Sequence, residues 1–178
     1  MTFKFTIDKE FSWEGGHRVW AQRLDRPDLS IETECACKHL HGHSYSIKVF
    51  LGANELDQSQ MVTDFKNLNF MKAFIDNVLD HKFMIDINDP NFEIITGVHP
   101  SLVSNATNFS NLTEYVLYTK DPNKLLHYTS FVLVDFVPTS ENICKYLKLY
   151  AQERIGNFAK VVAVELWETK KSHCRYED

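Results

Sequence analysis

Two histidines separated by a single glycine are the residues of this chain best suited to chemistry. They are His41 and His43, within the run CKHLHGHSY over residues 37–45. Because side chains two residues apart in a β-strand point to the same face, both imidazoles would lie on one side, together with Tyr45 and Ile47. Imidazole nitrogen is a preferred ligand of zinc, so this pattern predicts part of a metal site.

A third ligand is expected at His17, which follows Gly15-Gly16 at the end of a predicted strand over residues 2–13. That strand can pair antiparallel with a second predicted strand over residues 43–52 and bring His17 beside the other two imidazoles. Three histidines with an open fourth position are typical of a catalytic zinc ion.

A rival interpretation combines both cysteines of the region with the H-x-H pair as a closed structural site, with ligands Cys35, Cys37, His41 and His43. Its residue types suit zinc, but its spacing lacks the longer loop that usually separates two ligand pairs. A chain of 178 residues can also build a sufficient core without a metal. We therefore favour the three-histidine site.

The elements that must position these residues follow from hydrophobic periodicity. Strands are predicted over residues 2–13, 43–52, 131–137 and 160–169, with Gly15-Gly16 expected to break the first. Helices are predicted over residues 65–79, capped by Asp64, and from Thr139 or Ser140 to Gly156. Residues 87–128 carry little pattern and are interpreted as a surface insertion. This order predicts one α+β domain over residues 1–178.

Composition excludes several classes of function. The formal net charge is −5 and the pI is near 5.9, which argues against a nucleic-acid partner. The first residues lack the apolar run of a signal peptide or a membrane anchor. The four cysteines are therefore expected to be free thiols in a cytoplasmic protein that does not associate with membranes.

Five segments in this order resemble the 6-pyruvoyl-tetrahydropterin synthase/6-carboxy-tetrahydropterin synthase family. They are FSWEGGHRV, CKHLHGHSY, LDHKFM, PTSEN and VELWET, and they run from residue 11 to residue 169. The resemblance implies the tunnelling fold, a four-stranded antiparallel sheet with two helices on one face. It also implies a homo-oligomer (a trimer or hexamer) whose sheets close into a barrel, with active sites between subunits. The implied substrate is 7,8-dihydroneopterin triphosphate, a pterin triphosphate.

The resemblance also assigns roles to individual residues. It implies that zinc is held by His17, His41 and His43. It implies that protons are moved by Cys37, Asp80 and His81. It implies that the pterin is contacted by Thr139, Ser140, Glu141 and Glu168. Cys35 leaves the identity of the base open, because it has the longer spacing of the pyruvoyl-forming branch and Cys37 has the shorter spacing of the carboxy-forming branch.

Glu168 also stands out by its position in the last strand. It shares the parity of Val162, Val164 and Leu166, so its carboxylate would extend an apolar face. A carboxylate in such a place needs a partner. The resemblance supplies one, because the ring N–H and amino groups of a pterin can donate to a carboxylate.

Three functions remain open from the sequence. The first is a zinc-dependent 6-carboxy-5,6,7,8-tetrahydropterin synthase, a lyase that forms 6-carboxytetrahydropterin, acetaldehyde and triphosphate on the path to queuosine precursors. The second is a 6-pyruvoyl-tetrahydropterin synthase, which eliminates triphosphate without releasing acetaldehyde. The third is a non-catalytic protein that binds zinc or pterin on the same scaffold.

Overall fold

The structure is a computed structural model that describes residues 3–26, 28–29, 34–116 and 119–177. The chain divides into two compact units. The first unit comprises residues 1–13, 44–80 and 140–178, and the second comprises residues 14–43 and 81–139. In the part of the chain that is described, no helix has both the length and the apolar character needed to cross a membrane.

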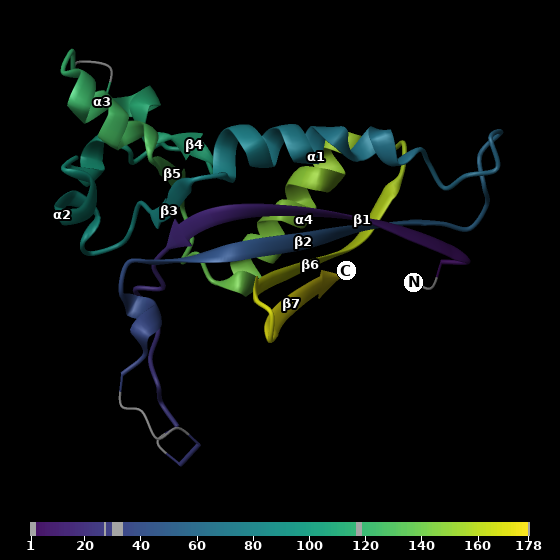
Figure 1. Ribbon diagram of the computed structural model, residues 1–178, viewed down its shortest axis with the longest axis horizontal. Coiled ribbons are helices and arrows are strands. Elements are labelled where there is room, and N and C mark those ends of the chain that lie inside the picture. The colour runs from purple at the N-terminus through teal and green to yellow at the C-terminus, as the bar shows by residue number, and fades with distance from the viewer. Residues whose placement is uncertain (1–2, 27, 30–33, 117–118, 178) are drawn as a thin grey trace. The chain divides into compact units, whose positions relative to one another are not determined.

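An antiparallel sheet forms the first unit, with the strand order β1, β2, β6, β7 (Figure 1). The strands are β1 (Phe5–His17), β2 (His41–Ala53), β6 (Lys160–Thr169) and β7 (Ser172–Glu177). β2 pairs antiparallel with β6, and β6 pairs antiparallel with β7. β1 is also antiparallel to β2, because Gly52 contacts Phe3 whereas Ser46 Oγ donates a hydrogen bond to Glu10 Oε1.

One face of this sheet is buried, as the alternation of residue types predicts. On β2 the side chains of Tyr45, Ile47, Val49 and Leu51 are at most 3% exposed, whereas the intervening Ser46 is only partly buried. Side chains of β2 therefore alternate between the core and the opposite face of the sheet.

Two helical segments belong to the first unit. The first is continuous through η2 (Phe65–Leu68), α1 (Asn69–Phe74) and η3 (Ile75–Leu79). Asp64 accepts a hydrogen bond from the Lys66 amide and so caps this segment, as predicted. The second is α4 (Ser140–Ile155), whose buried residues include Ile143 and Leu147. The rings of Phe74 and Tyr150 pack at 4.1 Å between centroids and join the two segments.

β1 does not break at Gly15-Gly16 but continues to His17, so that prediction was wrong. These glycines allow close packing of strands rather than a turn. A Cβ atom on Gly42 would lie 2.9 Å from the Gly15 carbonyl oxygen, and a Cβ atom on Gly16 would lie 2.5 Å from the Phe83 ring. Close approach of the Gly15 backbone explains glycine at position 42, and close approach of the Phe83 ring explains glycine at position 16.

The strands β6 and β7 also differ from what the sequence pattern predicts. The pairing register of β6 shifts so that Leu51 faces Val161 and Phe50 faces Ala163, which leaves Val162 as an extra residue. Val161 is therefore buried and Val162 is not, contrary to the predicted parity. β7 was not predicted, because its exposed polar residues give little strand pattern.

The second unit contains the ends of β1 and β2 with three further strands, in the order β4, β5, β3, β1, β2. The added strands are β3 (Lys82–Asp86), β4 (Ser110–Asn111) and β5 (Phe131–Val134). β3 is parallel to β1 and to β5, whereas β4 is antiparallel to β5. The sheet thus has more strands than the four predicted, although the fold class is α+β as expected.

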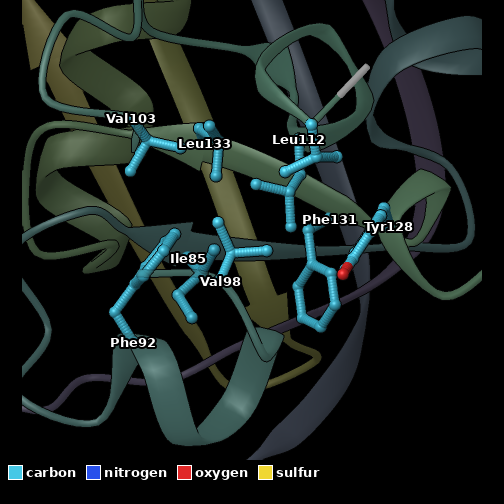
Figure 2. Close-up of a cluster of buried hydrophobic side chains, with 9 residues drawn as sticks. Ile85, Phe92, Val98, Val103, Leu112, Tyr128, Phe131 and Leu133 are labelled. Atoms are coloured by element: carbon cyan, nitrogen blue, oxygen red, sulfur yellow. The ribbon is translucent and has the colours of Figure 1, made fainter. Parts of the chain in front are cut away.

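Residues 87–128 form the crossover that a parallel pair such as β3 and β5 requires. The described chain between β3 and β5 contains the helical elements α2 (Phe92–Thr96), η4 (Pro100–Leu102), η5 (Leu112–Tyr115) and α3 (Pro122–Thr129). Nine side chains from this segment and its flanking strands are at most 6% exposed and form one cluster (Figure 2): Ile85, Phe92, Val98, Val103, Leu112, Val116, Tyr128, Phe131 and Leu133. The segment thus contributes to a core, while its origin as an insertion stays a prediction.

The close approach at Gly42 predicts a measurable stability effect. We expect Gly42→Ala to lower the free energy of unfolding by about 1–3 kcal/mol, because the added methyl group would meet backbone atoms rather than a movable side chain. Chemical denaturation followed by circular dichroism measures this. The exposed Ser12→Ala on β1 is the matched control and should change stability little. Equal stability of the two variants would contradict the packing argument.

Candidate active site

Three imidazoles converge in the second unit. His17 is the last residue of β1, and His41 and His43 lie at the start of β2. The ring centroids are 4.5 Å apart for His17 and His41, 5.1 Å for His17 and His43, and 4.9 Å for His41 and His43. One nitrogen from each ring can be chosen so that all three lie within 4.8 Å of one another. The expected juxtaposition is therefore present.

Backbone carbonyls orient two of these rings. His17 Nδ1 lies 2.7 Å from the Pro138 carbonyl oxygen, and His41 Nδ1 lies 2.8 Å from the His39 carbonyl oxygen. A carbonyl oxygen can only accept, so both Nδ1 atoms carry a proton, and in the neutral ring Nε2 then presents a lone pair. The two Nε2 atoms face each other at 3.0 Å. This tautomer is the one that makes Nε2 available as a metal ligand.

The surroundings of His17 and His43 lower the pKa of both imidazoles and so disfavour their protonated forms. His17 is only 1% exposed. Burial lowers its pKa from 6.5 to about 4, with smaller contributions in the same direction from His41 and His43, although the hydrogen bond to Pro138 opposes the shift. Burial and then His41 also lower the pKa of His43. A neutral His17 with two further imidazoles converging on it fits a divalent cation such as zinc.

The two cysteines of this region lie just before β2. Cys35 precedes the short helix η1 (Ala36–Lys38), which contains Cys37, and both side chains are partly buried. The Cys37 carbonyl accepts a hydrogen bond from the Val19 amide at 2.9 Å. Among the described residues, the group of converging ligand atoms contains neither thiol. The geometry therefore favours the three-histidine interpretation over the closed four-ligand site.

Asp80 and His81 lie at the end of the first helical segment. The Asp80 amide donates to the Ile75 carbonyl and so closes η3. His81 is exposed and has a positive φ of 57°, a conformation that few residues other than glycine adopt. Its amide donates to the Glu14 carbonyl at 2.7 Å, which helps to hold this backbone. Such strained conformations are concentrated at functional sites.

The two carboxylates that are expected to bind substrate, Glu141 and Glu168, belong to the first unit. Glu141 lies in the first turn of α4, and the partly buried Glu168 lies near the end of β6. Burial raises the pKa of the Cys174 thiol, and the charges of Glu141 and Glu168 raise it further, while a hydrogen bond with Cys144 acts in the opposite direction. Both carboxylates thus influence Cys174, a residue that the sequence pattern did not connect with them.

The remaining expected contacts flank the start of α4. Ser140 is its first residue, and the Thr139 amide donates to the Val137 carbonyl at 2.7 Å. Sequence reasoning did not identify the carbonyl groups of Pro138 and His39 as partners of the histidines. Backbone atoms carry no residue-type signal, although Pro138 does belong to the PTSEN segment.

Comparison with known proteins places these observations in a family. The family model described as 6-pyruvoyl tetrahydropterin synthase matches residues 6–178. A 6-carboxy-5,6,7,8-tetrahydropterin synthase from Aquifex aeolicus is 31% identical, over 98% of this chain and 99% of its own length. The enzyme of the same name from Haemophilus influenzae is 26% identical, again over 98% of this chain and 99% of its own length.

Solved structures show the same fold. The crystal structure of an uncharacterized protein from Wolinella succinogenes is 40% identical, with a TM-score of 0.84 over 98% of both chains. A 6-pyruvoyl tetrahydropterin synthase from Caenorhabditis elegans is 22% identical, with a TM-score of 0.57 over 100% of this chain and 99% of that chain. The expected α+β tunnelling fold is thereby confirmed.

The buried His17 predicts how the metal-free protein responds to acid. Between pH 6.5 and about 4 the unfolded chain binds a proton at His17 that the folded chain does not, so stability must fall as the pH falls through this window. We expect His17→Gln to lose less stability over the same window, as measured by urea unfolding in a chelator. Parallel profiles for the two metal-free proteins would contradict the assigned environment of His17.

Proposed function

The chain belongs to the 6-pyruvoyl tetrahydropterin synthase family, and we propose that it is a zinc-dependent 6-carboxy-5,6,7,8-tetrahydropterin synthase. The reaction would convert 7,8-dihydroneopterin triphosphate and water to 6-carboxytetrahydropterin, acetaldehyde and triphosphate, as a step toward queuosine precursors. The observation that carries the proposal is the convergence of three imidazoles, two of which present Nε2 because Nδ1 is bound to a carbonyl.

The metal would be held by His17, His41 and His43. When bound, zinc stabilises negative charge on the oxygens of a substrate side chain and makes the adjacent C–H groups more acidic. The hydrogen bonds to Pro138 and His39 would keep the two imidazoles aligned while substrate enters and product leaves.

Cys37 is the proposed base and His81 the proposed partner in proton transfer. Cys37 is partly buried in η1, just before the metal-binding residues in the chain, and is followed by the exposed Lys38. His81 presents an exposed imidazole from a backbone with positive φ. Asp80, which closes η3, is proposed to orient His81. Proton transfer along the side chain needs both a base and an acid of this kind.

Glu168 and Glu141 are proposed to bind the pterin ring, together with Thr139 and Ser140. Glu168 is partly buried near the end of β6, where its carboxylate can accept hydrogen bonds from a ring N–H and an amino group. The charges of Glu141 and Glu168 both act on the Cys174 thiol, which supports a shared role for the two carboxylates. Two carboxylates suit the donor-rich edge of a pterin.

The proposed enzyme acts as a homo-oligomer, a trimer or hexamer, with active sites between subunits. The net acidic chain must receive a triphosphate, so basic residues have to be gathered locally. Exposed Lys38 is one source, and a neighbouring subunit is another. The proposed location is the cytoplasm, where four free cysteines stay reduced.

Two observations favour the carboxy-forming over the pyruvoyl-forming reaction. The curated relatives from Aquifex aeolicus and Haemophilus influenzae both bear the carboxy-forming name. Cys37 also precedes the H-G-H run with the spacing of the carboxy-forming branch. A non-catalytic zinc or pterin binder on this scaffold remains the alternative of another class.

A product assay on protein of measured zinc content tests the proposal. We expect purified protein to release acetaldehyde from 7,8-dihydroneopterin triphosphate, to lose that activity after chelation, and to regain it with zinc. Triphosphate release without acetaldehyde would indicate the pyruvoyl-forming reaction. Zinc binding without turnover would indicate the non-catalytic alternative, and full activity of zinc-free protein would contradict the metal site.

The two neighbouring cysteines provide a matched pair of variants. We expect Cys37→Ala to lower kcat by about 10²–10⁴-fold, the usual contribution of a positioned acid or base, with zinc content unchanged. Cys35→Ala, which alters a partly buried thiol of the same loop, should keep most of the activity. The reverse outcome would make Cys35 the base, and full activity of both variants would remove cysteine from the mechanism.

A further inference from the structure

Immediately after His17, the chain is held by a buried ion pair. Arg18 Nη1 lies 3.4 Å from Asp89 Oδ1, with the Asp89 side chain 1% exposed and the Arg18 side chain 16% exposed. In the amide orientation that suits its neighbours, the Asn91 side-chain oxygen accepts from Arg18 Nη1 and Nη2 at 2.9 and 3.2 Å. The backbone N–H of Asn91 donates a hydrogen bond to Asp89 Oδ1 at 2.8 Å. The Arg18 guanidinium is thus bound by Asp89 and Asn91 of the same chain.

A second buried carboxylate holds the next turn of the same segment. Trp20 Nε1 donates to Asp86 Oδ2 at 2.8 Å, and Asp86 is 2% exposed. The other oxygen of Asp86 accepts from the Asn88 amide and side chain at 2.9 and 3.1 Å. Asp86 is therefore bonded through both oxygens, one of them to Trp20.

These contacts and the sheet fix the chain on both sides of His17. Before His17, Gly15 and Gly16 pair in parallel with Lys82 and Phe83 at the start of β3. After it, Arg18 and Trp20 bind carboxylates at the end of β3 and in the loop that follows. β3 and the loop that follows it therefore contact the segment around His17 both before and after this residue.

The loop that carries Asp89 is anchored in turn by the core of residues 87–128. The Asp89 carbonyl accepts from the Phe92 amide at 2.8 Å, and Phe92 is 1% exposed within the cluster of nine side chains. Figure 2 shows Phe92 beside Ile85 and Val98. Two contacts thus connect this core to the residue that follows His17: Phe92 bonds to Asp89, and Asp89 pairs with Arg18.

We propose that Arg18 and Trp20 are positioning residues for the metal centre, and that residues 87–128 serve as their anchor. The inference rests on the proposed function, because it assigns these residues to the alignment of His17 as a ligand. Stability alone is a weak explanation for a buried ion pair, since desolvation offsets much of its attraction. Within the described residues, Asp89 Oδ2 and Arg18 Nε also lack hydrogen-bond partners, which adds to that cost.

Cobalt binding by the full chain tests the proposal. Co²⁺ replaces zinc in imidazole sites and reports ligand geometry through its visible absorption. We expect Arg18→Gln and Trp20→Phe each to weaken Co²⁺ affinity by about ten-fold, as the loss of residues that orient a metal ligand does, and to alter the spectrum. Arg18→Lys, which keeps the charge, should restore part of the affinity.

A destabilising variant outside these contacts provides the control. Leu147→Ala opens a cavity in the core of the first unit, outside residues 87–128 and outside both carboxylate contacts, and should lower the melting temperature yet leave Co²⁺ affinity and spectrum unchanged. Equal losses in Leu147→Ala, or wild-type affinity and spectrum in both Arg18→Gln and Trp20→Phe, would overturn the inference while the proposed function stands. A wild-type chain that binds neither Co²⁺ nor Zn²⁺ would overturn both.

Discussion

Two hydrogen bonds from imidazole Nδ1 atoms to backbone carbonyls determine what the histidine cluster can bind. They direct the Nδ1 protons of His17 and His41 to Pro138 and His39, and the two Nε2 atoms face each other at 3.0 Å. Burial makes protonation of His17 unfavourable, so its Nε2 lone pair is available to a metal cation. The strand pairing, the glycines and the buried carboxylates all act by keeping these rings in place.

The close pairing of β1 with β2 explains why the cluster forms where it does. Glycine at position 42 lets the two backbones approach, since a side chain there would meet the Gly15 carbonyl. β3 then adds a parallel partner to the end of β1 and delivers the carboxylates that bind Arg18 and Trp20. Residues 87–128 provide the crossover between β3 and its other parallel neighbour, β5. The segment least readable in the sequence thus supports the strand that carries a metal ligand.

The sequence predicts the parts of the site that depend on side-chain periodicity and type. The period of two places His41 and His43 on one face, and the apolar alternation of β2 identifies its buried side. The sequence does not predict features that depend on backbone contacts. Gly15-Gly16 is equally compatible with a turn and with close strand packing, and the bulge at Val162 changes the face of Val161 without any residue signal. The carbonyl partners of the histidines are invisible for the same reason, because every residue has a carbonyl group.

The coordination of the bound metal tests the central claim most directly. An X-ray absorption spectrum at the zinc edge, recorded on the purified full chain, reports the type and distance of the ligand atoms. The account predicts stoichiometric zinc with three imidazole nitrogens at about 2.0–2.1 Å, a further light atom, and no sulfur. Sulfur at about 2.3 Å would instead show that Cys35 or Cys37 is a ligand, and would contradict a three-histidine centre with an open position.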